Sequence, residues 1–112
     1  MSLQPRLTYD DLSHTIQIFG RFDFSISKEF DNLVQKVSID QGVGIDFSYC
    51  NYIDSAGIGA LVRLKVDTDE LDSNIRLLNC KDTVLETLKI ADFYKLFHLE
   101  DCGSAFFQWF KN

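Results

Sequence analysis

The chain has 112 residues, of which 46% are hydrophobic and 25% charged, and these fractions are typical of one globular domain. Its 17 acidic and 11 basic residues give a formal charge of −6, which argues against nucleic acid as a partner because phosphate binding needs clustered Lys and Arg. No apolar run approaches the roughly 18–20 residues of a membrane helix, and no secretory signal is recognisable. We therefore expect a cytoplasmic protein without membrane insertion.

The first half of the chain predicts two strands and a helix. Residues 5–9 and 14–20 are the strands, separated by a polar turn, and Ile16 and Ile18 alternate with polar neighbours in the second one. Ser25 or Ser27 is the expected N-cap of the helix that follows. The apolar stripe of this helix, at helical spacing, should consist of Ile26, Phe30, Leu33, Val34 and Val37.

The second half repeats the alternation. Strands are expected at residues 43–47 and 74–80, with a shorter extended piece at 96–99. Helices should occupy the stretch up to about Leu71, a segment opening at 81–83, and the chain from about Gly103. The apolar positions expected to pack in the first of these helices are Ile58, Leu61, Val62 and Val66. Strands followed by helices at this spacing predict an α/β fold, a single domain over residues 1–112. Its sheet should be mixed and mostly parallel, with four to five strands and about four helices.

The most informative segment is Asp54-Ser55-Ala56-Gly57-Ile58-Gly59, which lies where a strand ends and a helix begins. Its glycines allow a sharp turn and a close approach by another surface. The free N–H groups of a helix N-terminus would stabilise a phosphate on Ser55. A helix cap without further function would equally place Ser or Asp here, and the motif alone leaves both interpretations open.

Catalytic motifs are missing around Ser55. A hydrolase elbow, Gly-x-Ser-x-Gly, would need glycine where Ile53 stands, and no His is positioned by the sequence as a base. The chain has no Gly-Lys-Ser/Thr of a phosphate-binding loop, and Gly57-x-Gly59 lacks the third glycine of a dinucleotide motif. We therefore expect no enzyme activity and no cofactor.

Two motifs carry a resemblance to a known family. The run from Tyr52 to Leu61 resembles the signature of STAS domains of the bacterial anti-sigma factor antagonist type, and residues 20–23 (Gly-Arg-Phe-Asp) resemble the family's turn after its second strand. The order of elements matches from about residue 6 to 107. The resemblance implies a non-enzymatic protein that binds a serine-kinase anti-sigma factor while unphosphorylated and is released when phosphorylated. A PP2C-type phosphatase would restore the unmodified form.

The resemblance also assigns residues. It makes Ser55, directly after the motif residue Asp54, the phosphorylation site. Ala56 stands where some members have a second serine, which leaves Ser55 as the single hydroxyl of the loop. Asp23 corresponds to an acid near the serine that helps to contact the kinase. The other partner-binding residues that it implies are Asp54, Ala56, Gly57, Ile58 and Gly59.

The sequence is also compatible with other functions. The chain fits a cytoplasmic STAS accessory subunit of a lipid-transport ATPase, or a partner-switch regulator whose output is not a sigma factor. A small-nucleotide-binding domain is a third class, because glycines stand at a helix N-terminus. The sequence leaves a homodimer open.

Metal-binding patterns are weak. Cys50, Cys80 and Cys102 form no CxxC pair, so we expect reduced, mostly buried thiols. The acidic run at 67–72 superficially resembles a calcium loop, but Leu71 stands at a ligand position and the required glycine is missing. We expect a solvated acidic helix end instead.

The C-terminal aromatic cluster has two interpretations. Phe106, Trp109 and Phe110 share one helical face. We expect this face to seal the sheet as part of the core; the alternative is a contact surface for a partner or a second copy.

Overall fold

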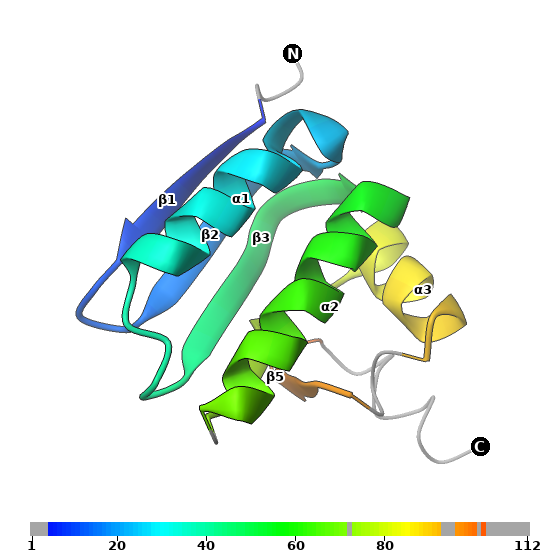
Figure 1. Ribbon diagram of the computed structural model, residues 1–112. Coiled ribbons are helices and arrows are strands. Elements are labelled where there is room, and N and C mark those ends of the chain that lie inside the picture. Colours follow the sequence, from blue (N-terminus) through cyan, green and yellow to red (C-terminus); the bar gives the residue numbers. More distant parts are fainter. Residues whose placement is uncertain (1–4, 72, 93–95, 101, 103–112) are drawn as a thin grey trace.

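The computed structural model describes residues 5–71, 73–92, 96–100 and 102, and its centre is a five-stranded sheet with the order β1-β2-β3-β4-β5 (Figure 1). The edge strand β1 (Arg6–Asp10) pairs antiparallel with β2 (Thr15–Phe22). The remaining neighbours pair in parallel: β2 with β3 (Val43–Ile53), β3 with β4 (Ile75–Leu78), and β4 with β5 (His98–Glu100). The predicted mixed, mostly parallel sheet is confirmed.

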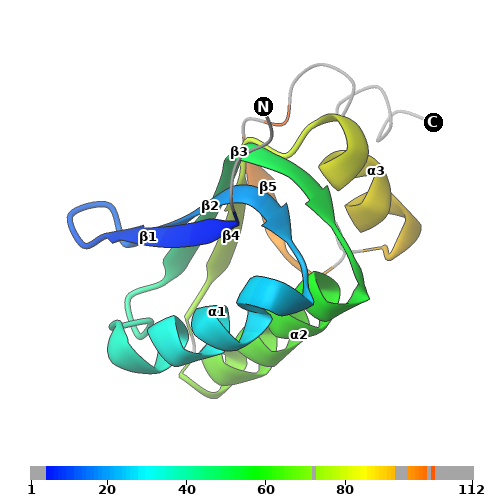
Figure 2. The same cartoon turned by 90° about the horizontal axis from the view of Figure 1, so that it is seen from above.

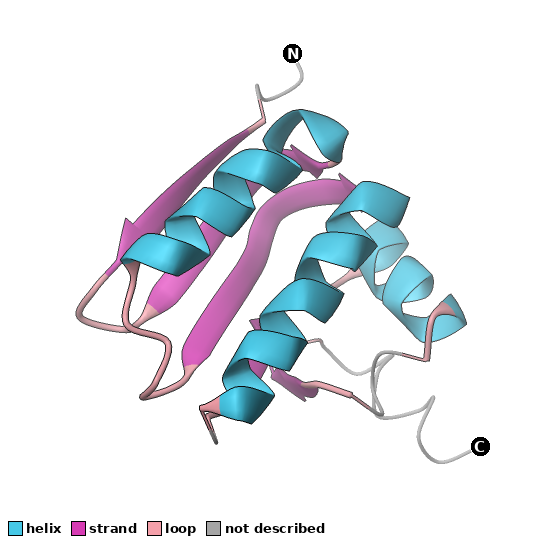
Figure 3. Cartoon of the chain, in the orientation of Figure 1, coloured by secondary structure: helices cyan, strands magenta, loops and turns pink. Residues whose placement is uncertain are grey.

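Helices cover both faces of this sheet. The helices α1 (Phe24–Lys36) and α2 (Ser55–Glu70) lie side by side on one face, while α3 (Asp82–Ile90) lies on the other (Figures 2 and 3). Three of the roughly four expected helices are therefore present. The predicted last helix from Gly103, with its aromatic cluster, lies outside the described residues.

The main core lies between the sheet and the pair α1 and α2. The predicted stripe of α1 is confirmed: Ile26, Phe30 and Val34 are buried, and the other two positions are half-buried. The ring of Phe22 in β2 packs 4.9 Å from that of Phe30 and 6.5 Å from that of Phe47, measured between centroids. Each fully buried apolar side chain of this kind contributes about 1.5–3 kcal/mol to folding.

The strand β3 is longer than the five residues expected from the sequence. It continues to Ile53 because its second half stays paired with β2, through Phe19 with Tyr49 and Phe22 with Ile53. The pairing shifts register between residues 17 and 19 and again between 20 and 21, where Gly20 has a φ of 80°. Such irregularities interrupt the apolar alternation that marks a strand in the sequence.

The predicted cap of α1 is wrong by a few residues. Asp23, and neither Ser25 nor Ser27, is the N-cap, because its carboxylate accepts the Ser25 N–H at 3.0 Å. The helix therefore begins at Phe24. Asp is as good a cap as Ser, so the sequence offered several adjacent candidates for one position.

The helix α2 is also rotated relative to the expected stripe. Val62 and Val66 are 41% and 53% exposed, while Ala60 and Leu64 are buried beside Leu61. Gly57 is buried at the start of this helix and determines which side faces the sheet. The expected stripe left out Gly57, Ala60 and Leu64, all of which are buried.

The three cysteines are buried thiols, with no disulfide between them. Burial raises the pKa of Cys50, and a hydrogen bond between the thiols of Cys80 and Cys102, together with burial, raises the pKa of Cys80. Both thiols are therefore poorly reactive in the folded protein.

Candidate functional site

The candidate site forms where β2 and β3 end next to each other. Phe22 and Ile53 are partners in the pairing of these strands, and the Asp54 N–H donates to the Phe22 carbonyl at 3.3 Å. The next residues start the helices α1 and α2, which begin at the same edge of the sheet (Figure 1). The fold thus brings the two sequence motifs, around Asp23 and around Ser55, to one place, the carboxyl edge where α/β proteins usually bind ligands.

Asp54 is the N-cap of α2. Its carboxylate accepts the N–H groups of Ala56 at 2.9 Å and Gly57 at 3.1 Å, and its carbonyl accepts the N–H of Ile58 at 2.9 Å. Two of the otherwise unpaired N–H groups of the helix end are satisfied in this way. The capping function therefore belongs to Asp54.

Ser55 is the first residue of α2 and is exposed. Within the described part of the chain, its hydroxyl has no hydrogen-bond partner, because the neighbouring aspartate occupies the capping position. Its position at a helix N-terminus favours negative charge. The hydroxyl is thus available for chemistry without disturbing the cap.

Asp23 performs the same structural function for α1 and is only 8% exposed. Its carboxylate accepts from both the N–H and the hydroxyl of Ser25, and these bonds hold the pKa of Asp23 below its usual value. The Arg21 guanidinium lies 3.5 Å away and acts in the same direction. Most of this carboxylate is committed to the helix start, so direct contact of Asp23 with a partner stays a prediction.

The two glycines of the motif differ in function. A Cβ on Gly57 would lie 2.4 Å from the Phe22 carbonyl oxygen and 2.8 Å from a side-chain carbon of Ile53, so only glycine fits. A Cβ on Gly59 would meet only the flexible Arg63 guanidinium, at 3.3 Å. Of the other predicted loop residues, Ala56 and Ile58 are half-buried, and Ile58 packs against the core. The motif is thus partly structural and partly surface.

One exposed aromatic residue near the site was not expected from the sequence. Phe24 follows Asp23 directly, begins α1, and is 77% exposed. It precedes the buried position Ile26 by two residues and so falls off the apolar stripe of the helix. An exposed aromatic side chain at the edge that also carries Ser55 is a candidate contact residue.

Two basic residues of α2, beyond the start of the helix, form ion pairs within the protein. Arg63 of α2 pairs with Asp31 of α1 at 2.9 Å, and Lys65 pairs with Asp69 one turn along α2 at 2.6 Å.

The described residues contain no group of three or more His, Cys, Asp or Glu suited to a metal ion. No helix among them is long and apolar enough to cross a membrane.

Comparisons with known proteins found a matching family model and a relative. The family model of the STAS domain matches residues 7–102. A STAS-domain containing protein of Pseudomonas aeruginosa (strain UCBPP-PA14) is 34% identical over 86 residues, which cover 76% of this chain and 85% of that protein.

Solved structures share the fold at low identity. A putative anti-sigma factor antagonist from Thermotoga maritima has a TM-score of 0.68 at 13% identity, over 96% of this chain and 95% of its own. The anti-sigma factor antagonist SpoIIAA in its unphosphorylated form has a TM-score of 0.65 at 16% identity, over 91% and 92% of the two chains.

Proposed function

The chain belongs to the STAS domain family, and we propose that it acts as an anti-sigma factor antagonist whose partner binding is controlled by phosphorylation of Ser55. The observation that carries the proposal is the exposed Ser55 hydroxyl, which starts a helix already capped by its neighbour Asp54. Proteins called anti-sigma factor antagonists are among those that share its fold, and this supports the assignment.

In the unphosphorylated form, the partner binds the edge at which α1 and α2 begin. Phe24 and the half-buried Ile58 supply apolar contact area there, and Ser55 lies on the same edge. The partner is a serine-kinase anti-sigma factor, so its active site must reach this hydroxyl. Exposure of Ser55 at the first residue of a helix, and not within a packed turn, makes that approach geometrically simple.

Phosphorylation then changes the charge of this edge without changing the fold. A phosphate adds about −1.5 to −2 charges next to Asp54 and near the start of α1. Like charges against a docked partner cost several kcal/mol as an order of magnitude, while the helix N-terminus stabilises the phosphate within the protein itself. The partner is released, and a PP2C-type phosphatase resets the switch in the cytoplasm.

Phosphosite mapping tests this proposal. The protein is incubated with ATP and each candidate serine kinase of the same genome, and the modified residue is located by mass spectrometry. We expect phosphate on Ser55 and none on the Ser55→Ala variant. Modification elsewhere, or stable co-purification with a transport ATPase that is indifferent to Ser55→Ala, would contradict the proposal and favour the accessory-subunit function.

A further inference from the structure

The surface between α1 and α2 contains a groove that runs along the two helices toward their C-terminal ends. One hollow of about 430 Å³ lies between the C-terminal ends of the helices, and a second of about 370 Å³ continues it along the helix pair. The two share Val34, Gln35 and Asp67 as lining residues, so they form one continuous depression, the α1–α2 groove. At about 1.5 Å per residue, Glu70 beside the larger hollow lies roughly 22 Å along the axis of α2 from Ser55, whereas the second hollow reaches back to Ala60.

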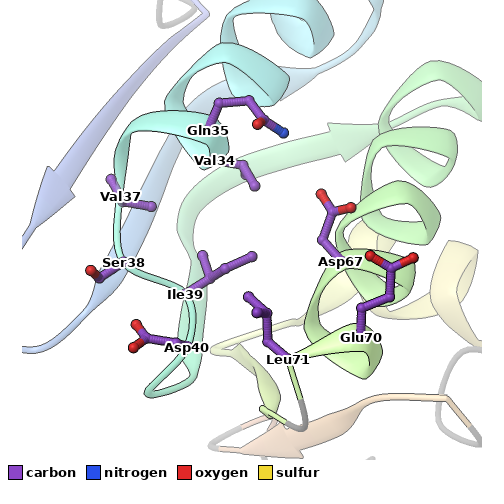
Figure 4. A pocket seen from close by; sticks show the side chains of 9 residues that line it. All are labelled: Val34, Gln35, Val37, Ser38, Ile39, Asp40, Asp67, Glu70 and Leu71. Atoms are coloured by element: carbon purple, nitrogen blue, oxygen red, sulfur yellow. The ribbon is translucent and has the colours of Figure 1, made fainter.

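The floor of the α1–α2 groove is apolar. Val34 and Ile39 are nearly buried beneath it, and Ala60 and Leu64 continue it along α2. Its α2 side carries Val66 and Leu71, which are 53% and 50% exposed. Figure 4 shows Val34, Ile39 and Leu71 directed toward the same space. Apolar side chains left exposed around a depression are typical of a protein-binding surface.

The rim of the groove is acidic. Asp40, Asp67 and Glu70 border the larger hollow, and none of them forms an ion pair with another described residue (Figure 4). Among the described residues, Arg63 is the one basic residue that lines either hollow, and its charge is already paired with Asp31. The potential in the groove is therefore negative.

The stability of α2 does not explain these acids. The negative end of the helix dipole favours basic residues in the last turn, as Lys36 in α1 and Lys89 in α3 illustrate. The last turn of α2 has no basic residue and instead carries acidic ones. The acidic residues therefore interact unfavourably with the dipole of α2 at the place where the groove opens. Such local conflicts are expected at functional surfaces.

We propose that the α1–α2 groove binds a cationic segment of a partner protein, in which apolar side chains alternate with Lys or Arg. The apolar side chains fill the floor, and the basic groups pair with Asp40, Asp67 and Glu70 on the rim. The charge excludes anionic lipid and nucleic acid, and it disfavours a second copy, which would bring a further charge of −6. This docking site is separate from the Ser55 switch and does not rest on it.

A titration followed by amide NMR tests the proposal with an amphipathic Lys/Leu peptide as probe and a Glu/Leu peptide of the same pattern as control. We expect shifts centred on Val34, Asp67 and Leu71 with the Lys/Leu peptide alone. The double variant Asp67→Lys/Glu70→Lys should weaken binding about tenfold or more. The matched control Asp11→Lys/Glu86→Lys, which changes two exposed acids elsewhere by the same charge, should bind within about twofold of wild type.

Three results would overturn the proposal. Equal losses in both double variants would mean attraction by net charge alone. Concentration-dependent shifts at the groove without peptide would identify a second copy as its occupant. Loss of peptide binding in Ser55→Asp would show that the groove is not separate from the switch; retained binding in that variant is expected whether or not the Ser55 proposal holds.

Discussion

Gly57 and Phe22 are in closer contact than any other amino acid at position 57 would allow. A Cβ there would lie 2.4 Å from the Phe22 carbonyl oxygen. The same carbonyl accepts the Asp54 N–H at 3.3 Å. The peptide group of Phe22 at the end of β2 therefore fixes two things: the position of Asp54, which follows β3, and the rotation of α2 about its axis. The position of Ser55 depends on both.

This contact predicts opposite effects for the two glycines of the motif. Gly57→Ala should lower the free energy of unfolding by about 1–3 kcal/mol, since backbone atoms must move to admit the methyl group. Gly59→Ala should be neutral or stabilise by up to about 1 kcal/mol, because it removes a flexible helical glycine. Urea denaturation of the two variants checks this pair. Equal destabilisation would contradict the assigned difference.

The caps predict a second contrast. Asp54→Ala should cost about 1 kcal/mol of stability, because two helix N–H groups lose their acceptor. Ser55→Ala should stay within about 0.5 kcal/mol of wild type, since the Ser55 hydroxyl has no partner among the described residues. Thermal or urea unfolding measures both. Strong destabilisation by Ser55→Ala would instead make Ser55 a structural residue.

Acid sensitivity should come in part from Asp46 in β3. Burial alone would raise the pKa of Asp46, but hydrogen bonds from Ser48 and Asn79 outweigh it and hold this pKa below its ordinary value of 3.8. A carboxyl with a lowered folded pKa stabilises fully above its unfolded pKa and loses this contribution as pH falls through the folded value.

Stability measured by urea from about pH 7 to about pH 3 should therefore decline at the acid end. Asp46→Asn should be less stable at neutral pH and should decline less steeply below about pH 4. An unchanged acid slope in this variant would exclude Asp46 as a source of the effect.

The layer arrangement of the fold could be predicted from the sequence because strand and helix periods alternate clearly. Ile16 and Ile18 mark β2, and Ile26, Phe30 and Val34 mark the buried side of α1. The rotation of α2 could not be predicted, because it depends on a backbone contact of Gly57 that no side-chain pattern records. The far end of β3 was missed because two register shifts, each with an extra residue in β3 itself, break its alternation.

The segment that forms the candidate site could be predicted from the sequence, but the structural function of each residue in it could not. The motif located Ser55 and Asp54, but it did not tell which of them caps the helix, since both residue types do so equally well. Phe24 was missed because exposure depends on where the helix starts, and that start was expected at the wrong residue. The acidic run at 67–72 was recognised only as a solvated helix end, because the groove beside it is formed by residues of another helix.

The affinity of the protein for its serine-kinase partner, measured by calorimetry with ADP present, tests the switch most directly. We predict that the protein phosphorylated on Ser55 binds at least about a hundredfold more weakly than the unmodified protein, which corresponds to about 2.7 kcal/mol. Ser55→Ala should bind as tightly as the unmodified protein. Equal affinity of the phosphorylated and unmodified forms would contradict the account.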